Sequence, residues 1–292
     1  MADDSACTNS SAYKFGVLAA DELPALRAHL LATAATISPS LFGTILLTQE
    51  GLNIRLSGPT QAVHAMQAVL SALHPNIGHI VFKDSLSATP TLRKFLVRIK
   101  KEVISMGMPS VNPARDGLAT HISPLEFKAW MDEKKDMVVL DTRNDYEVRL
   151  GTFDNAIDLD IKSFRAFPDV AKAKLEAVPK EKPVVMFCTG GVRCEKASYA
   201  LLEHGHTNVY QLDGGILKYF EDCGGAHYNG DCYIYDDRVA LTPALTKATD
   251  IAMCFVCRSP LTAAEQASCD FTHGVSCPYC VGGKRSDFRS QP

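Results

Sequence analysis

An apolar run that ends in a cysteine and two glycines is the feature that most constrains the fold. The run is Val184–Phe187, and it is followed by Cys188-Thr189-Gly190-Gly191-Val192-Arg193-Cys194-Glu195. An apolar run of this length is typical of a buried strand, and we expect a helix to begin at about Cys194 or Glu195. A strand, a tight glycine loop and a helix in this order are typical of a parallel α/β sheet.

The same alternation of strands and helices extends through the second half of the chain. We expect two further buried strands, Val138–Leu140 and Val209–Leu212. We expect three helices, Pro124–Glu133, Phe167–Val178 and Glu195–His204. This alternation predicts a parallel sheet covered by helices on both faces.

The loop that begins at Cys188 has the composition of an anion-binding site. The strand places the cysteine at the carboxyl-terminal edge of the sheet, where ligands bind in open α/β folds. Gly190 and Gly191 allow the backbone N–H groups to point at the sulfur, in front of the positive end of the helix. Arg193 adds a positive charge. We therefore predict a thiolate nucleophile at Cys188, while the alternative is a small apolar residue buried at a strand end.

Cys194 has two interpretations of equal weight. It could resolve a sulfenic acid or a persulfide on Cys188 by forming a disulfide, because a second thiol near a cysteine of low pKa is a common redox arrangement. It could instead be the first buried residue of the helix.

The first half of the chain predicts a different fold. Residues 1–12 are expected to form a mobile tail. Five strands are expected, at Tyr13–Leu18, Gly43–Leu47, Ile54–Leu56, Ile77–Lys83 and Phe95–Lys100. Two helices are expected, at Glu22–Ala35 and Thr60–Ala72. The order βαββαβ, followed by the fifth strand, predicts a ferredoxin-like (acylphosphatase-like) α+β sandwich.

The domain boundaries follow from these patterns. The ferredoxin-like domain is expected over residues 13–107 and a linker, containing the proline-rich stretch Met108–Gly117, over 108–121. The central α/β domain is expected over residues 122–226, and a small cysteine-rich tail over 227–292.

The tail carries two pairs of cysteines with the spacing of metal ligands. Cys254-x-x-Cys257 is followed, after nineteen residues, by Cys277-x-x-Cys280. This pattern predicts a tetrahedral four-thiolate zinc site with a structural role, because such a site leaves no open position on the metal. The alternative is four free thiols in a tail with little stability of its own.

The other cysteines give weaker indications. The chain has ten cysteines, and its first residues lack the basic start and apolar core of a secretory signal, which favours thiol or metal chemistry over a disulfide scaffold. Cys269 lies between the two pairs and is expected to be a bystander. The pattern assigns no role to Cys223 or Cys232.

Charge and hydropathy limit the possible partners. With 30 basic and 33 acidic residues the net charge is −3, which excludes a uniformly basic surface that coats nucleic acid. One local basic stretch contains Arg93, Lys94, Arg98, Lys100 and Lys101. On charge alone we favour a solvated helix or strand edge there. No apolar run approaches the roughly 20 residues of a membrane span, so we expect no membrane partner and a cytoplasmic protein.

The spacing within the Cys188 loop resembles that of a rhodanese. Four residues separate Cys188 from Arg193, whereas cysteine phosphatases have five. The segment Val138–Gly151 resembles the rhodanese strand with its acid–arginine set, and Gln211–Gly215 resembles the double-glycine turn that closes that fold. The acid–arginine set is Asp141, Arg143 and Glu147. We expect these side chains to brace the loop by hydrogen bonds rather than to take part in catalysis.

Longer segments resemble the tRNA uridine(34) hydroxylase family, whose members contain a rhodanese domain. They are Gly43–Gly58, Val97–Glu102, Asp141–Glu147 and Cys188–Ser198. The resemblance implies oxygen-dependent hydroxylation of the wobble uridine of tRNA at C5, with Cys188 as a persulfide intermediate and molecular oxygen as co-substrate. It also implies a tRNA partner bound at the anticodon region. We hypothesise that the basic stretch contacts phosphates of the anticodon arm. The sequence shows no flavin or nicotinamide fingerprint.

Two other functions fit the same residues. A sulfurtransferase would relay the sulfur of a Cys188 persulfide to a protein or a tRNA. A non-enzymatic rhodanese module would only dock partners, but the presence of Cys188 argues against it.

Overall fold

The computed structural model describes residues 6–108, 111–116 and 120–283. The chain divides into two units, Met1–Leu118 and Ala119–Pro292. Among the described residues, no helix is both long and apolar enough to cross a membrane.

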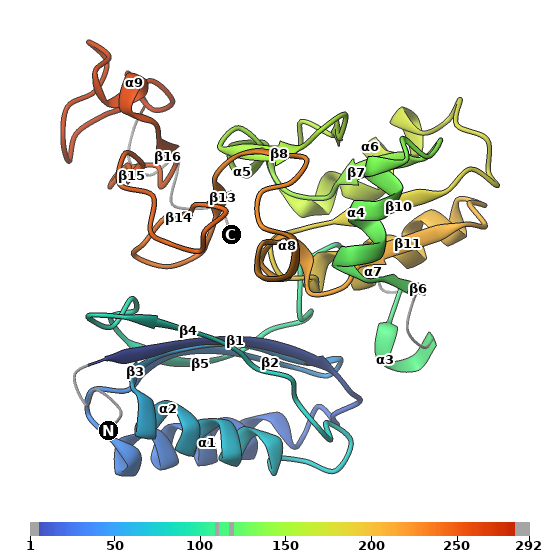
Figure 1. Cartoon of the computed structure of the whole chain (residues 1–292). Helices are drawn as coiled ribbons and strands as arrows, with labels where there is room; N and C mark the ends of the chain where they lie inside the picture. Colours follow the sequence, from blue (N-terminus) through green and yellow to red (C-terminus); the bar gives the residue numbers. More distant parts are fainter. Residues whose placement is uncertain (1–5, 109–110, 117–119, 284–292) are drawn as a thin grey trace. The chain divides into compact units, whose positions relative to one another are not determined.

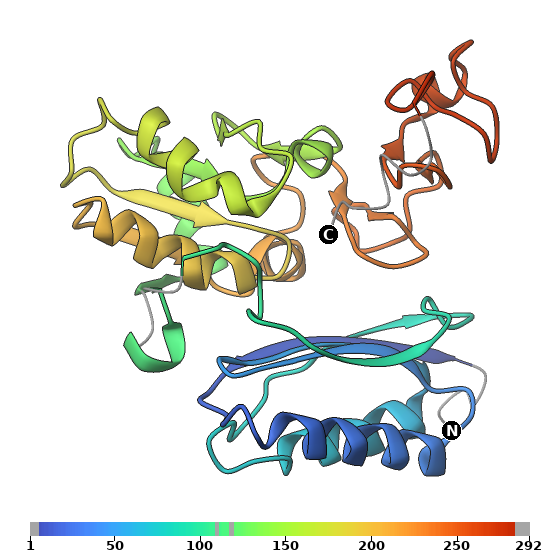
Figure 2. The ribbon, with the colours of Figure 1, turned by 180° about the vertical axis from the view of Figure 1, so that it is seen from behind.

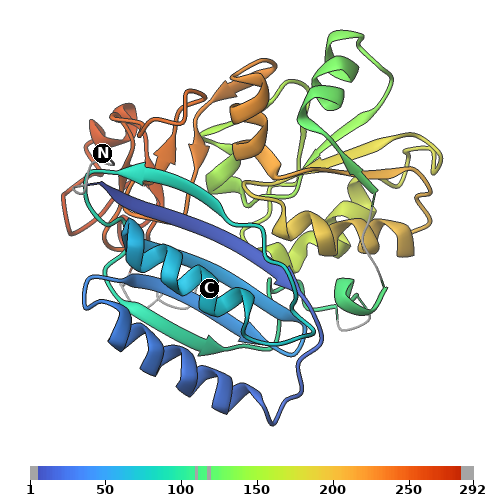
Figure 3. The same cartoon turned by 60° about the horizontal axis from the view of Figure 1, so that its bottom comes forward.

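The first unit is a five-stranded sheet with two helices on one face, α1 (Leu23–Ile37) and α2 (Thr60–Ser71). Figure 3 shows the two helices lying beside each other across the sheet. The strands are β1 (Cys7–Phe15), β2 (Phe42–Thr48), β3 (Gly51–Pro59), β4 (Lys83–Ser87) and β5 (Phe95–Ile99). Their order is β4-β1-β3-β2-β5, and only the β2–β5 pair is parallel. This confirms the ferredoxin-like α+β domain.

Two expectations for this unit were wrong. Residues 7–12 belong to strand β1 rather than to a mobile tail, because Thr8, Asn9 and Ser10 are buried and this segment pairs with β3 and β4. The fourth strand lies at Lys83–Ser87, not at Ile77–Lys83. Ile77 and Ile80 are buried in the core, so their apolar side chains mark packing without strand pairing.

The expected linker also contains regular structure. Helix α3 (Pro113–Asp116) lies within it, and strand β6 (Thr120–Ile122) begins before it ends. β6 pairs in parallel with Tyr210–Leu212, so it is an edge strand of the second unit. Residues 109–110 and 117–119 of that linker lie outside the described residues.

The second unit contains a parallel sheet of order β6-β11-β10-β7-β9 (Figure 1). The other strands of this sheet are β7 (Val138–Asp141), β9 (Ile157–Asp158), β10 (Val184–Phe187) and β11 (Val209–Leu212). Its helices are α4 (Pro124–Asp132), α5 (Asp145–Val148), η1 (Phe164–Ala166), α6 (Phe167–Lys174), α7 (Val192–Glu203) and α8 (Gly215–Cys223). The parallel α/β domain is therefore confirmed.

Strand β10 shows why this sheet is covered on both faces. Val185 and Phe187 belong to an apolar cluster with residues of α4 and α8. Because successive side chains of a strand point to opposite faces, Val184 and Met186 face the other side, and they are also fully buried. Figure 2 shows α6 and α7 along the sheet in a second view.

The remainder of the chain consists of short elements. An antiparallel pair joins β8 (Gly151–Phe153) with β12 (Tyr228–Gly230). After it come β13 (Cys232–Tyr233), β14 (Ala240–Leu241), β15 (Ala252–Met253), β16 (Pro260–Leu261) and α9 (Ala263–Gln266). These elements carry little regular hydrogen bonding, in agreement with the expected small cysteine-rich tail.

Candidate active site

The parallel strands β7 and β10 end side by side, and this shared edge positions the candidate site. Phe187 pairs with Asp141 in the parallel register, so Cys188 and Thr142 follow at the same carboxyl-terminal edge. The Thr142 hydroxyl and backbone N–H both donate to the carbonyl of Phe187, at 3.0 and 3.1 Å. These bonds fix the point at which the Cys188 loop leaves the sheet.

The loop surrounds the Cys188 sulfur with donors. The Gly191 N–H donates to Sγ at 3.1 Å, and Gly191 has a φ of 102°, which favours glycine. Helix α7 begins at Val192, earlier than the sequence predicted, so Arg193 and Cys194 lie in its first turn. The Arg193 N–H and the Cys194 thiol also donate to this sulfur.

These donors decide the ionisation of Cys188. The side chain is buried, which disfavours a charge. The Cys194 thiol, the Arg193 charge and the two backbone N–H groups outweigh that cost and hold the pKa of Cys188 well below its ordinary value. Burial and the neighbouring Cys188 thiolate raise the pKa of Cys194, so Cys194 stays protonated and donates.

The double-glycine turn supports the loop from behind. The N–H groups of Ile216 and Leu217 donate to the carbonyls of Cys188 and Thr189, at 2.9 and 3.2 Å. Gly215 lies so close that an added Cβ would stand 2.5 Å from the Cys188 carbonyl oxygen. Only glycine fits there without moving the loop, which gives the predicted turn a direct role at the site.

A buried ion pair closes the side of the loop. The Arg193 guanidinium donates two bonds to the Glu147 carboxylate, at 2.5 and 2.8 Å. Although burial opposes the charge of Glu147, the arginine lowers the pKa of that carboxyl below its ordinary value. Thr189 of the loop donates to the same carboxylate at 3.3 Å. Glu147 therefore holds the Arg193 guanidinium and the loop together.

The other acid–arginine pair lies one step further from the sulfur. Arg143 donates to both oxygens of Asp141 and to the carbonyl of Gly151 at 2.7 Å. Thr152 donates to Asp141 at 2.8 Å. Asp141 and Arg143 thus brace strand β7 against β8, whereas Glu147 braces the loop itself.

Sequence reasoning missed three tyrosines beside this ion pair. The Tyr235 hydroxyl donates to Glu147 at 2.9 Å and lies 3.1 Å from the Tyr146 hydroxyl. The Tyr233 ring stands edge-on to the rings of both. Two of the three come from the segment after Cys223, where the sequence pattern weakens. The run Cys-Tyr-Ile-Tyr, with its alternating aromatics, was the available signal.

Cys232 also lies close to the site. It is fully buried, and burial raises the pKa of its thiol to about 12. Its sulfur contacts the carbonyl of Tyr233 at 3.6 Å. These surroundings make Cys232 an inert packing residue, in contrast to Cys188.

The four cysteines of the predicted metal site come together. Their sulfurs all lie within 4.8 Å of one another, and three pairs are 3.5, 3.6 and 3.9 Å apart. A tetrahedral zinc ion with Zn–S bonds of roughly 2.3 Å requires sulfurs about 3.8 Å apart. The donor set and its geometry therefore fit a metal ion such as zinc. Cys269 is exposed and lies outside the cluster.

Two family models match the chain. A UPF0176 acylphosphatase like domain matches residues 7–103, and a Rhodanese-like domain matches residues 123–222. Among solved structures, a rhodanese-like domain from Anabaena sp covers 39% of this chain and 80% of its own, with 16% identity and a TM-score of 0.33.

Curated relatives cover almost the whole chain. The tRNA uridine(34) hydroxylase of Cupriavidus taiwanensis is 45% identical over 284 residues, which are 94% of this chain and 97% of that protein. The protein of the same name from Burkholderia orbicola is 44% identical, over 94% of this chain and 96% of its own length. This chain belongs to the tRNA uridine(34) hydroxylase family.

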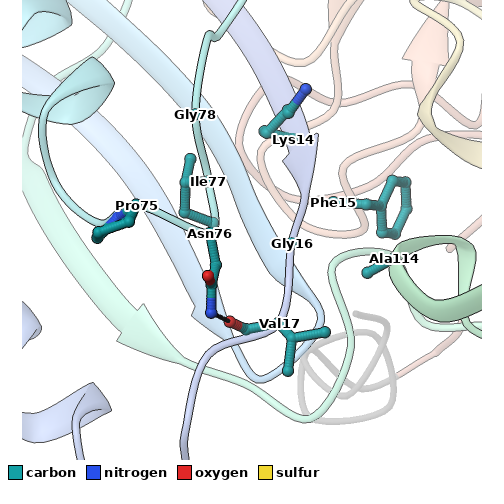
Figure 4. A pocket seen from close by; sticks show the side chains of 9 residues that line it. All are labelled: Lys14, Phe15, Gly16, Val17, Pro75, Asn76, Ile77, Gly78 and Ala114. Carbon is teal, nitrogen blue, oxygen red and sulfur yellow. Dashed lines mark hydrogen bonds between the residues drawn. The ribbon is translucent and has the colours of Figure 1, made fainter.

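In this family member the basic stretch belongs to the first unit, whereas the sulfur loop belongs to the second. Its five side chains are exposed, and three of them lie on or beside the edge strand β5, namely Lys94, Arg98 and Lys100. Arg93 and Lys101 flank them. The first unit also has a pocket of about 570 Å³ where Asn76 donates to the Val17 carbonyl at 3.0 Å (Figure 4). No cysteine or carboxylate lines that pocket.

Proposed function

We propose that the chain is a cytoplasmic enzyme that hydroxylates the wobble uridine of tRNA, position 34, at C5 to give 5-hydroxyuridine. The observation that carries the proposal is the Cys188 thiol of depressed pKa, in a chain 45% identical over 94% of its length to a protein named tRNA uridine(34) hydroxylase. Molecular oxygen is the proposed co-substrate: one of its atoms would enter the new hydroxyl group, and the other would leave as water, reduced by two electrons from an external donor.

The reactive form that we propose is a persulfide on Cys188. The Cys188 side chain is only 1% exposed, so a bulky substrate has little access to Sγ itself. A second sulfur would extend the side chain by an S–S bond of about 2.05 Å. The N–H groups of Gly191 and Arg193, which already face Sγ, would stabilise its negative charge. Thr189, Gly190 and Val192 shape the loop around it.

Cys194 is the proposed resolving thiol. Its sulfur contacts that of Cys188. Attack of Cys194 on Sγ of the persulfide would form a Cys188–Cys194 disulfide and break the bond to the outer sulfur. That sulfur leaves as hydrosulfide and takes the proton of Cys194. In the resting protein the same thiol donates its hydrogen bond to the Cys188 thiolate.

The other predicted residues have supporting roles. Arg193 and Glu147 fix the loop, and Asp141 with Arg143 fixes the strand beneath it. The exposed basic side chains at 93–101 are proposed to contact phosphates of the anticodon arm. The four-cysteine cluster is proposed to hold structural zinc, since four thiolates would leave no open coordination position.

Nucleoside analysis of tRNA tests the proposal. A deletion strain would be complemented with the natural chain, with Cys188→Ser, or with Cys269→Ser as a control at an exposed cysteine. We expect mass spectrometry to detect 5-hydroxyuridine at position 34 with the natural chain and the control, and to find background levels with Cys188→Ser. Growth under isotopically heavy oxygen gas should label the new hydroxyl group.

Two results would contradict this function. Unchanged 5-hydroxyuridine with Cys188→Ser would remove the cysteine from the reaction. Thiosulfate-to-cyanide turnover by the purified chain, with no change in tRNA hydroxylation on deletion, would identify a sulfurtransferase instead.

A further inference from the structure

The Tyr235 side chain has its hydroxyl held in the site, while the residue is partly exposed to solvent. The hydroxyl donates to the Glu147 carboxylate at 2.9 Å and lies 3.1 Å from the Tyr146 hydroxyl. The residue is nevertheless 41% exposed. Because the hydroxyl is engaged in these contacts, we infer that the aromatic ring contributes to the exposed surface.

Two contacts fix the orientation of this ring. Its hydroxyl is anchored to Glu147, and the Tyr233 ring packs against it edge-on, with centroids 4.9 Å apart and planes at 87°. Burial and the Glu147 charge raise the pKa of Tyr235 well above its ordinary value, so the phenol remains a donor at neutral pH. An exposed ring that is held in this way is ready to bind without further ordering.

The ring is connected to the reactive sulfur by direct contacts. Glu147 binds Tyr235 and the Arg193 guanidinium through the same carboxylate. The Arg193 backbone N–H then donates to the Cys188 sulfur. Two residues, Glu147 and Arg193, therefore link Tyr235 to the sulfur.

We propose that the exposed ring of Tyr235 is the stacking platform for the nucleobase that the enzyme modifies. The proposal rests on the proposed function, because it takes the substrate to be an unpaired base of an RNA loop. Proteins that read single-stranded RNA stack its bases on aromatic side chains, and each such stack contributes about 1–3 kcal/mol. Stacking is non-polar, so it leaves the edge of the base free to meet the sulfur.

If Tyr235 has a purely structural role, its variants should behave differently from those of a stacking platform. If the hydroxyl matters only because it holds Glu147, then Tyr235→Phe should be as harmful as Tyr235→Leu. If the ring is the platform, Tyr235→Phe should retain RNA binding and Tyr235→Leu should lose it. Leucine fills much of the volume of the ring but has no π face.

The experiment measures the affinity of an anticodon stem-loop RNA with uridine at position 34 and of the same RNA with an abasic site there. For the natural chain and Tyr235→Phe we expect the uridine form to bind roughly 5–150-fold more tightly. For Tyr235→Leu we expect the ratio to fall close to one. The control variant Phe255→Leu removes another exposed aromatic ring, in the four-cysteine tail, and should keep the full ratio.

The proposal is overturned if Tyr235→Leu still prefers the uridine RNA over the abasic RNA as strongly as the natural chain does. It is also overturned if Tyr235→Phe loses this preference to the same extent as Tyr235→Leu. The thiolate absorbance of Cys188 is measured in every variant, and Tyr235→Ala replaces the leucine variant if that one does not fold. If the natural chain makes 5-hydroxyuridine but does not distinguish the two RNAs, the stacking proposal fails and the proposed function stands. If it makes none, the proposed function itself fails.

Discussion

The second unit holds sulfur in two different ways, at the Cys188 loop and at the four-cysteine cluster of the tail. At the loop, backbone N–H groups, a thiol and the charge of Arg193 converge on one sulfur. In the cluster, four sulfurs converge on one another and all lie within 4.8 Å. The loop can therefore ionise its cysteine by itself, whereas the cluster needs a cation to bring four thiolates together.

The comparison teaches what each site requires in order to fold. The loop rests on a buried sheet, and its donors belong to β10, α7 and the glycine turn. The cluster is surrounded by short elements with few apolar neighbours, among them Leu261, Val256 and Phe271. We infer that at the loop the surrounding fold creates the reactive Cys188 thiolate. In the tail, by contrast, binding of a metal by the four thiolates is needed for folding.

Removal of the metal from the four-cysteine cluster should cause the largest loss of stability among these predictions. Binding of structural zinc contributes roughly 10–16 kcal/mol in small zinc domains, so a strong chelator or Cys277→Ser should unfold the tail. The contact between Arg149 and the Tyr279 ring, 3.9 Å from guanidinium carbon to ring centroid, should be lost with it. Metal analysis, thiol counting and limited proteolysis would measure the change.

Cys269→Ser is the matched control for this experiment, because Cys269 lies between the two cysteine pairs but is exposed. It should retain metal and protease resistance. If the tail keeps its fold after complete removal of metal, its structure does not depend on the metal, and the contrast with the Cys188 loop is wrong.

Loss of the Glu147 carboxylate should cause the next largest decrease in the free energy of unfolding. Glu147→Ala leaves the buried Arg193 charge without its carboxylate, which costs about 3–5 kcal/mol of unfolding free energy. Urea denaturation would measure the loss. The control is Asp136→Ala, which removes an exposed partner of Lys182 and should cost less than about 1 kcal/mol. Equal losses in the two variants would show that the loop does not depend on its buried ion pair.

The pH dependence of the Cys188 thiolate should give the smallest but most specific effect. The ultraviolet thiolate absorbance that Cys188→Ser removes should persist as the pH falls below the ordinary thiol pKa of 9.0. Because the pKa is lowered in the folded state, the stability that the thiolate contributes is complete above pH 9.0 and disappears as the pH falls through the lowered pKa.

Cys194→Ala removes one donor and should move this titration toward the ordinary pKa. Cys269→Ser should leave it in place. A Cys188 that titrates like a free thiol would mean that the donors around it do not control its charge.

Local patterns in the sequence predicted the sheet and the sulfur loop. Val184–Phe187 matches strand β10 residue for residue, and the metal cluster contains the four predicted cysteines. Helix α7 begins earlier than expected because Val192 and Arg193 already adopt helical structure behind Gly191. Such patterns succeed where burial alone determines the structure.

Features that depend on distant contacts were not predictable in this way. Strand β6 has three residues, Thr-His-Ile, and is recognisable only through its pairing with β11. Tyr233 and Tyr235 reach the site from a short segment around β13, whose alternating pattern does not indicate which distant residues it contacts. Tyr235 bonds to Glu147 and contacts the Tyr146 hydroxyl, while the Tyr233 ring packs against the Tyr146 ring. Each of these contacts joins residues about ninety positions apart in the chain.

Strand β1 has a practical consequence for anyone who shortens the protein. Its first residues are polar and look dispensable, yet all of the β4 pairing is with Cys7–Ser11. A form that starts at Tyr13 would lose six of the nine β1 residues and leave β4 and residues 54–59 of β3 without their β1 partners. Unpaired strand edges recruit other chains, so such a truncation would yield aggregates rather than a smaller working domain.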